Sequence, residues 1–133
     1  MTKISDDEMK KTIADFIEMG HVENIVAMFK QDASYYRYTG DLLADERFMV
    51  RMGVVLLFEE LVVERPEDIA QAIPFLVPLL AEETPLYVLG EVLTVLGIIG
   101  NTEAKEYLRR YIDSPDPQLS EIARYYVLCE RWD

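Results

Sequence analysis

The sequence holds few of the residue types that most reaction centres use: one histidine, His21, and one cysteine, Cys129, among 133 residues. A single histidine excludes zinc sites built on two or three histidines, and a histidine-based triad would need His21 itself. A lone cysteine cannot form an intrachain disulfide, which agrees with a reducing compartment. We expect His21 to be a surface cap and Cys129 an inert buried thiol, and we expect no catalytic group, metal or cofactor.

Basic residues are scarce as well. Thirteen lysines and arginines stand against 25 aspartates and glutamates, which gives a formal charge of −12. Such a surface repels phosphate backbones, and no run of lysine and arginine is longer than a pair such as Arg109-Arg110. We therefore expect no nucleic-acid partner, and we expect an acidic surface that selects a basic protein or peptide.

A long apolar run is also missing. The longest nearly apolar stretch, residues 86–99, contains Glu91 and is shorter than the roughly 20 residues that span a bilayer. The first seven residues lack the apolar run and small-residue cleavage site of a secretory signal. These features predict a cytoplasmic protein that does not cross a membrane, and the length of 133 residues suits a single domain.

What the sequence does contain is a repeated pattern of capped apolar helices. Thr84-Pro85 and Asp116-Pro117 each place an N-cap residue before a proline, which suits the first helical position. At one constant offset the two segments match at Phe75 and Tyr107, Leu76 and Leu108, Leu80 and Ile112, Val95 and Val127, and Leu96 and Leu128. An earlier copy opens at Asp45, with Phe48, Leu56 and Leu57 at the positions of Tyr87, Val95 and Leu96. A unit of two helices cannot close a core alone and buries its apolar face on the next unit. The repeat therefore predicts a stack of antiparallel helix pairs.

These residues resemble the HEAT-like repeat proteins of the α-α superhelix, or armadillo-type, class. The resemblance covers residues 45–130 and is carried by the segments 72–80 and 113–117, Val50-Arg51, the turn before Pro85, and Leu96-Gly97-Ile98-Ile99-Gly100. The later copies carry Val88-Leu89 and Leu119-Ser120 where Val50-Arg51 stands in the first. The resemblance implies an all-α, short right-handed α-α superhelix, with residues 1–44 as capping helices and a diverged repeat and residues 45–133 as recognisable repeats. It also implies that the second helices line a concave surface that binds other proteins.

Local signals outline the helices. Ser5 and Glu8 form a capping-box pattern that starts a helix ended by Gly20, and Gly100-Asn101 is expected to end one helix and cap the next. A second helix is expected over residues 22–30, and Pro66 is expected to start a helix that Pro74 and Pro78 bend. In a helix over residues 86–99, the apolar residues cover most of the circumference and leave a narrow strip of three, namely Tyr87, Glu91 and Thr94.

Three tyrosines, Tyr35, Tyr36 and Tyr38, lie in the least repetitive stretch of the chain. Tyrosine is enriched at interfaces, so an aromatic binding patch is one interpretation. Packing of a long connection against the next helix pair is the interpretation we favour, because ring burial is the commoner use of tyrosine.

Helical phase and the resemblance together select candidate contact residues for a protein partner: Arg51, Tyr87, Glu91, Thr94, Glu121 and Arg124. The last helix has no following repeat to cover it, and Tyr125, Leu128 and Trp132 are left without an inward position. We therefore also hypothesise a homodimer, or docking on a partner, through the C-terminal helix. The main prediction is a noncatalytic protein-interaction module or scaffold.

An alternative function rests on the carboxylates. Glu60 and Glu64 stand one helical turn apart, as do Asp41 and Asp45 if their segment is helical. Paired carboxylates bind divalent cations or act as general acid and base, although solvated surface is their commoner role. The alternative is a carboxylate-based metal-dependent enzyme or a lyase-like helper for a pigment or prosthetic group. The helper hypothesis rests only on the existence of HEAT-like lyases.

Overall fold

The computed structural model describes residues 4–128, and these residues form helices and no strand. The predicted all-α class is therefore confirmed. The elements, in chain order, are α1 (Asp6–Glu18), α2 (Val22–Gln31), the 3₁₀ segment η1 (Ala33–Tyr38), α3 (Thr39–Leu43), α4 (Phe48–Glu64), η2 (Ile69–Ala72), α5 (Ile73–Leu76), η3 (Val77–Leu79), α6 (Leu86–Ile99), α7 (Thr102–Arg109) and α8 (Pro117–Leu128).

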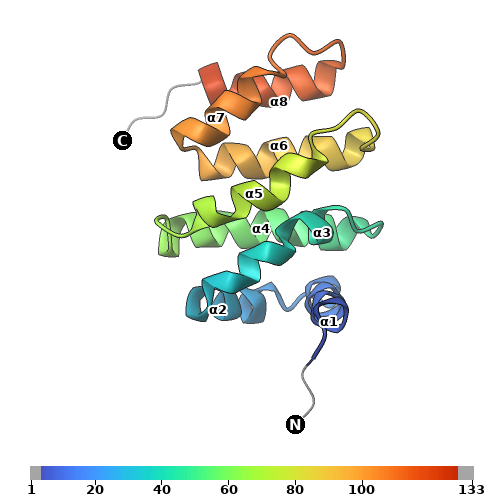
Figure 1. The fold of residues 1–133 in the computed structure, drawn as a ribbon, viewed down its shortest axis with the longest axis vertical. Helices are drawn as coiled ribbons and strands as arrows, with labels where there is room; N and C mark the ends of the chain where they lie inside the picture. Colours follow the sequence, from blue (N-terminus) through green and yellow to red (C-terminus); the bar gives the residue numbers. More distant parts are fainter. Residues whose placement is uncertain (1–3, 129–133) are drawn as a thin grey trace.

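The helices lie in layers along one axis (Figure 1). A front row consists of η1 with α3, then η2, α5 and η3, then α7, and a back row consists of α4, α6 and α8. In the back row α4 packs on α6 and α6 packs on α8, while α1 and α2 both pack on α4 at the N-terminal end of the stack. The helix at residues 86–99 is thus covered on two sides, as its apolar circumference predicts.

Most predicted helix ends are present. Ser5 Oγ accepts a hydrogen bond from the backbone amide of Glu8 at 3.1 Å, and Asn101 Oδ1 accepts one from Ala104 at 2.8 Å. Asp116 Oδ1 accepts from the first-turn amides of α8 at 3.0 and 3.1 Å. Gly20 and Gly100 follow α1 and α6 with φ of 89° and 65°, a conformation that costs glycine little.

Three predicted helix starts are wrong in detail. Asp45 does not open α4, because its Oδ1 accepts the Arg47 amide at 2.8 Å in a turn that precedes the helix. Pro85 is the N-cap of α6 and Thr84 caps nothing there. Pro66 lies in a turn, and regular structure resumes only at η2.

The two prolines of the front row break their helix more than the sequence predicts. The expected bent helix is divided into a 3₁₀ segment, a single turn of α-helix and a second 3₁₀ segment. Pro74 and Pro78 each lack an amide hydrogen, so the regular i to i−4 ladder cannot run through this segment. The break still leaves Leu76 buried.

One continuous core joins the two rows and the N-terminal helices. Its fully buried residues come from both rows: α4 contributes Leu57 and Phe58 and α6 contributes Val92, while the front row contributes Leu43 and Leu108. In residues 4–128 we find no helix that is both long enough and apolar enough to cross a membrane.

The tyrosine-rich connection packs into this core. Tyr36 is 1% exposed and its ring meets the rings of Phe29 and Phe58 edge-on, with centroids 5.2 and 5.9 Å apart. Tyr38 is also buried, and its hydroxyl donates to Asp6 Oδ1 at 2.9 Å. Only Tyr35 of the predicted aromatic patch keeps partial exposure. The burial supports the packing interpretation over a binding patch.

Replacing Tyr36 by phenylalanine is expected to stabilise the fold by about 1 kcal/mol, because the buried Tyr36 hydroxyl has no hydrogen-bond partner among the described residues. Burial also raises the pKa of Tyr36 to about 12. Because the unfolded chain then loses this proton first, wild-type stability should fall as the pH rises from about 10 towards 12, and Tyr36→Phe should remove this component. Urea unfolding at pH 7 and pH 11 checks both effects. A loss of stability in Tyr36→Phe at pH 7 would show that the hydroxyl has a partner.

Candidate functional site

Exposed apolar side chains concentrate on the back row of helices. Eleven large hydrophobic side chains are exposed among the described residues, and eight of them belong to α4, α6 or α8. We call this surface the back face; its large exposed apolar residues are Phe48, Met49, Leu56, Val63, Leu86, Tyr87, Tyr125 and Leu128. The concentration has a local cause in α4, which carries apolar residues on every side, so its uncovered side exposes hydrophobic side chains together with its glutamates.

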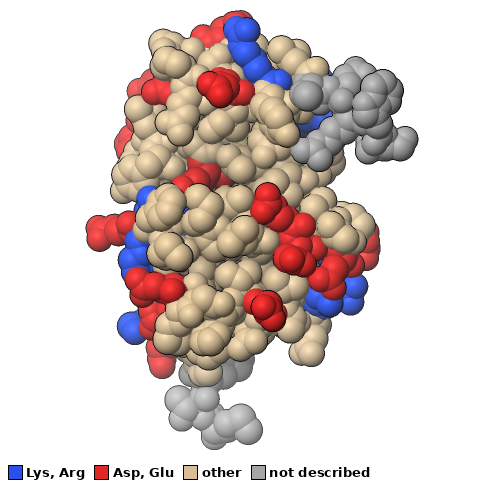
Figure 2. Space-filling view, turned by 180° about the vertical axis from the view of Figure 1, so that it is seen from behind, with Lys and Arg blue, Asp and Glu red and all other residues tan. Residues whose placement is uncertain are grey.

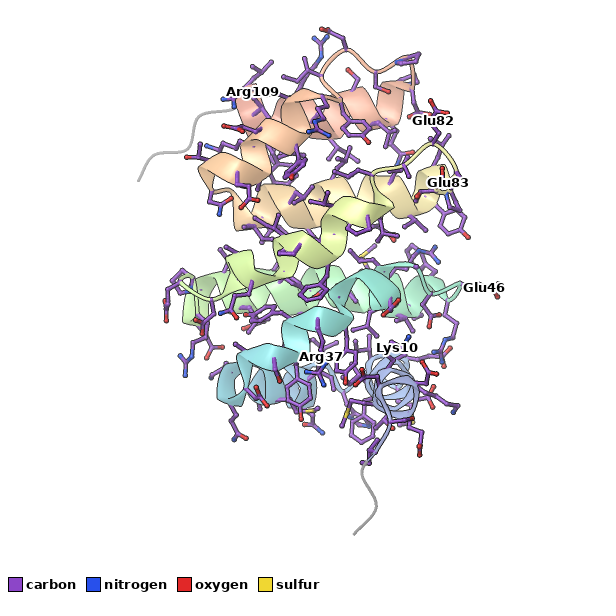
Figure 3. The ribbon with its side chains drawn as sticks, viewed as in Figure 1. Lys10, Arg37, Glu46, Glu82, Glu83 and Arg109 are labelled. Atoms are coloured by element: carbon purple, nitrogen blue, oxygen red, sulfur yellow. The ribbon has the colours of Figure 1, made fainter. Side chains whose placement is uncertain are left out.

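The back face carries far more acid than base. Figure 2 shows it largely uncharged, with aspartates and glutamates over it and basic side chains mostly at its margins. Glu46, before α4, and Glu82 and Glu83, before α6, are exposed at one edge of the stack (Figure 3). The apolar side chains at the start of both helices therefore lie near acidic loops.

Arg51 is the centre of one polar cluster on this row. Its Nε donates to Glu91 Oε2 at 2.8 Å, and its Nη1 donates to the carbonyls of Asp45 and Glu46, both at 2.9 Å. The guanidinium carbon lies 4.5 Å from the Tyr87 ring centroid, a distance typical of a cation–π contact. Arg51 is only 7% exposed, so it joins α4, the loop before it and α6 from beneath the surface.

Burial and the charge of Arg51 shift the pKa of the Glu91 carboxyl in opposite directions. Burial raises the pKa of the Glu91 carboxyl, and the neighbouring Arg51 guanidinium opposes that rise through its charge and its hydrogen bond. The pair is thus an ion pair in a partly desolvated setting, where removal of either partner is costly. Tyr87, which covers it, keeps about half of its surface exposed.

Of the other three predicted contact residues, two lie apart from this cluster. Thr94 follows Glu91 on the same strip of α6, and its hydroxyl donates to the Gly90 carbonyl at 2.9 Å. Glu121 is exposed on α8. Arg124 Nε donates to the Ile112 carbonyl at 3.0 Å, so its guanidinium holds the connection between α7 and α8. The structure unites three of the six residues and places Thr94 beside them.

A groove between α2 and α4 is a feature that the sequence reasoning missed. Its volume is about 610 Å³, and its lining combines four apolar residues with four glutamates and one lysine. The lining residues are Val22, Val26, Ala27, Leu56, Glu23, Glu59, Glu60, Glu64 and Lys30. The acids at helical spacing on α4 were visible in the sequence, but no local pattern indicates that α2 packs beside them.

Three of the four carboxylates behind the alternative function, all except Glu60, have basic partners among the described residues. Glu64 pairs with Lys30, and Asp41 lies 3.5 Å from Lys10 Nζ. Arg47 bonds Asp45 through Nε at 3.0 Å, and this contact lowers the pKa of the Asp45 carboxyl. Within residues 4–128 no group of three or more histidine, cysteine, aspartate or glutamate side chains is placed to hold a metal ion.

The end of the stack exposes two of the residues predicted for self-association. Tyr125 and Leu128 are 54% and 60% exposed on α8, while Trp132 and Cys129 lie outside the described residues. Self-association through this helix stays a prediction. Comparisons with protein-family models, with curated proteins and with solved structures find no match for this chain.

Proposed function

We propose that this chain is a noncatalytic protein-interaction module whose back face binds a basic protein or peptide. One observation carries the proposal: the large exposed apolar side chains gather on α4, α6 and α8, on a surface whose charges are mainly acidic. Exposed hydrophobic side chains gathered on one row of helices favour an interaction site, and aromatic and methionine residues such as Phe48, Met49 and Tyr87 are enriched at interface cores.

The same proposal includes a HEAT-like arrangement of the layers as a right-handed superhelix. The recurring front and back helices and the matching positions along the chain support it. In such an arrangement the second helix of each pair lines the binding surface, and here that helix is α4, α6 or α8. A module with one cysteine suits a reducing compartment, so we propose that it acts in the cytoplasm.

The acidic charge of the back face determines which class of partner it attracts. The chain carries −12, and an acidic back face attracts basic ligands and repels nucleic acid. Attraction between exposed charges is screened by salt, whereas apolar contact is not weakened in the same way. The partner should therefore associate faster and more tightly at low salt.

Affinity capture from the native cell extract tests the proposal. We expect wild-type protein to retain a basic protein at about 0.05 M salt and to release most of it at about 0.5 M. The double variant Tyr87→Ala/Tyr125→Ala should bind the identified partner about tenfold more weakly, because interface aromatics contribute most of the binding energy. Isothermal calorimetry with the purified partner gives the two affinities.

The matched control is Phe75→Ala, which removes an exposed ring from α5 in the front row. Its affinity should equal that of the wild type. An acidic partner, capture that persists unchanged at high salt, or equal losses in the front-row and back-row variants would each contradict the proposal.

A further inference from the structure

The groove between α2 and α4 has an apolar floor at the N-terminal end of the back face. Val26 is buried, Val22 is half-buried, and Ala27 is exposed, all on α2. Across the groove, Leu56 of α4 keeps 48% of its surface exposed. The groove volume of about 610 Å³ lies within the roughly 300–1,000 Å³ of pockets that enclose ligands or anchoring side chains.

The charges that line the groove are unbalanced. Lys30 is its only basic residue and already pairs with Glu64. Glu23, Glu59 and Glu60 are exposed and form no ion pair with the described residues. Three carboxylates therefore border an apolar floor without an ion-pair partner among residues 4–128, which is the complement of an apolar ridge with basic flanks.

We propose that this groove binds an amphipathic basic helix of the protein partner, an inference that rests on the proposed function and locates it. The apolar side of the helix enters between Val22, Val26 and Leu56, and its lysines or arginines meet Glu23, Glu59 and Glu60. A groove between two helices accepts a third helix through apolar anchors at i, i+3 or i+4, and i+7. Because α2 has 10 residues and is about 15 Å long, a partner helix of roughly three turns spans it.

Electrostatics disfavour a second copy of this chain in the groove. The chain has 25 acidic and 13 basic residues, so two copies repel each other at neutral pH. Lys30 in the groove, Lys10 of α1 and Arg37 of η1 already pair with acids of their own chain. The occupant should therefore come from another protein.

A synthetic peptide of about 14 residues, with leucines at helical spacing and lysines elsewhere, is the probe. Two further peptides serve as controls: one replaces every lysine by glutamate, and one scrambles the first so that no amphipathic helix forms. We expect the leucine-lysine peptide to bind, with amide chemical-shift changes concentrated in residues 22–30 and 56–64. The glutamate peptide should not bind, and the scrambled peptide should bind at least tenfold more weakly.

Two matched pairs of variants locate the contact. Glu23→Lys/Glu60→Lys should weaken peptide binding about tenfold, whereas Glu103→Lys/Glu106→Lys changes the net charge equally on α7 and should leave it within about twofold. Leu56→Ala should weaken binding several-fold, whereas Phe75→Ala, at a 42% exposed position on α5 in the front row, should not. All four variants alter exposed side chains, and circular dichroism is the check that each is folded.

The outcomes separate this inference from the proposed function. Equal losses in the α7 and groove charge variants, or no loss in either, would overturn the groove as the site. Shift changes centred on Tyr87 and Tyr125 would also overturn it while leaving back-face binding intact. Tight binding of the glutamate peptide, or association of two protein copies through α2 and α4 in sedimentation, would show that the occupant is of another kind.

Discussion

Replacing Arg51 by alanine is expected to lower the free energy of unfolding by about 3–5 kcal/mol, as removal of one partner from a buried ion pair does. The change leaves Glu91, whose side chain is 17% exposed, without its cation. It also removes the donor from the Asp45 and Glu46 carbonyls and the cation from beneath the Tyr87 ring. Chemical denaturation at neutral pH measures the loss.

The stability lost in Arg51→Ala should depend on pH in a defined direction. Burial already raises the pKa of Glu91 and Arg51 opposes that rise, so the pKa of Glu91 should be higher still in the variant. A carboxyl whose folded-state pKa is raised makes stability fall as pH increases from its unfolded value of about 4.5. Arg51→Ala should therefore cost less at pH 5 than at pH 8.

Two further variants control this prediction. Arg51→Ala/Glu91→Gln removes both charges and should recover about 1–2 kcal/mol of the loss at pH 8. Arg124→Ala removes a more exposed guanidinium from α8 and should cost less than about 1 kcal/mol. If Arg51→Ala unfolds like the wild type, or if its cost is the same at both pH values, the buried pair does not hold α4 to α6.

Replacing Gly40 by alanine is expected to destabilise the fold by about 2–3 kcal/mol, the cost of overpacking a close contact. A Cβ atom at this position would stand 2.2 Å from the carbonyl oxygen of Phe75. The clash is with backbone of α5, which cannot rotate away as the end of a side chain can. Thermal or urea unfolding shows the effect as a lower midpoint.

Gly90→Ala is the matched control for this prediction. Gly90 lies inside α6, and its added Cβ would have Ile122 Cδ1 at 3.7 Å as its nearest neighbour, an ordinary van der Waals contact. Alanine should therefore stabilise the protein by about 0.5–1 kcal/mol through its higher helix propensity. The prediction for Gly40 fails if both substitutions change stability in the same direction.

Together these two predictions change the interpretation of two residues. The sequence predicts Arg51 as a contact residue, yet its guanidinium is buried and supports the exposed ring of Tyr87 from beneath. Gly40 carried no signal in the sequence, because the reason for glycine there is a backbone more than 30 residues away. An effect of Arg51→Ala on partner binding should therefore follow from loss of local structure.

Local chemistry in the sequence determined much of the fold. The Ser5 cap, the Gly20 and Gly100 helix ends, and the Asn101 and Asp116 caps all act within a few residues, so their pattern is readable without a structure. The all-helical class and the two-sided burial of residues 86–99 follow from hydrophobic periodicity for the same reason. The strip of Tyr87, Glu91 and Thr94 also follows from the helical periodicity of residues 86–99 alone.

Only the tertiary structure decided which distant residues meet. The pairing of Arg51 with Glu91, the burial of Tyr36 against Phe58, and the groove between α2 and α4 each join segments separated by at least 20 residues. Periodicity states which side of a helix is apolar but not which helix will cover it, because that choice depends on how all the layers pack at once. The acidic groove is therefore a property of the packed stack, although each of its glutamates is visible in the chain.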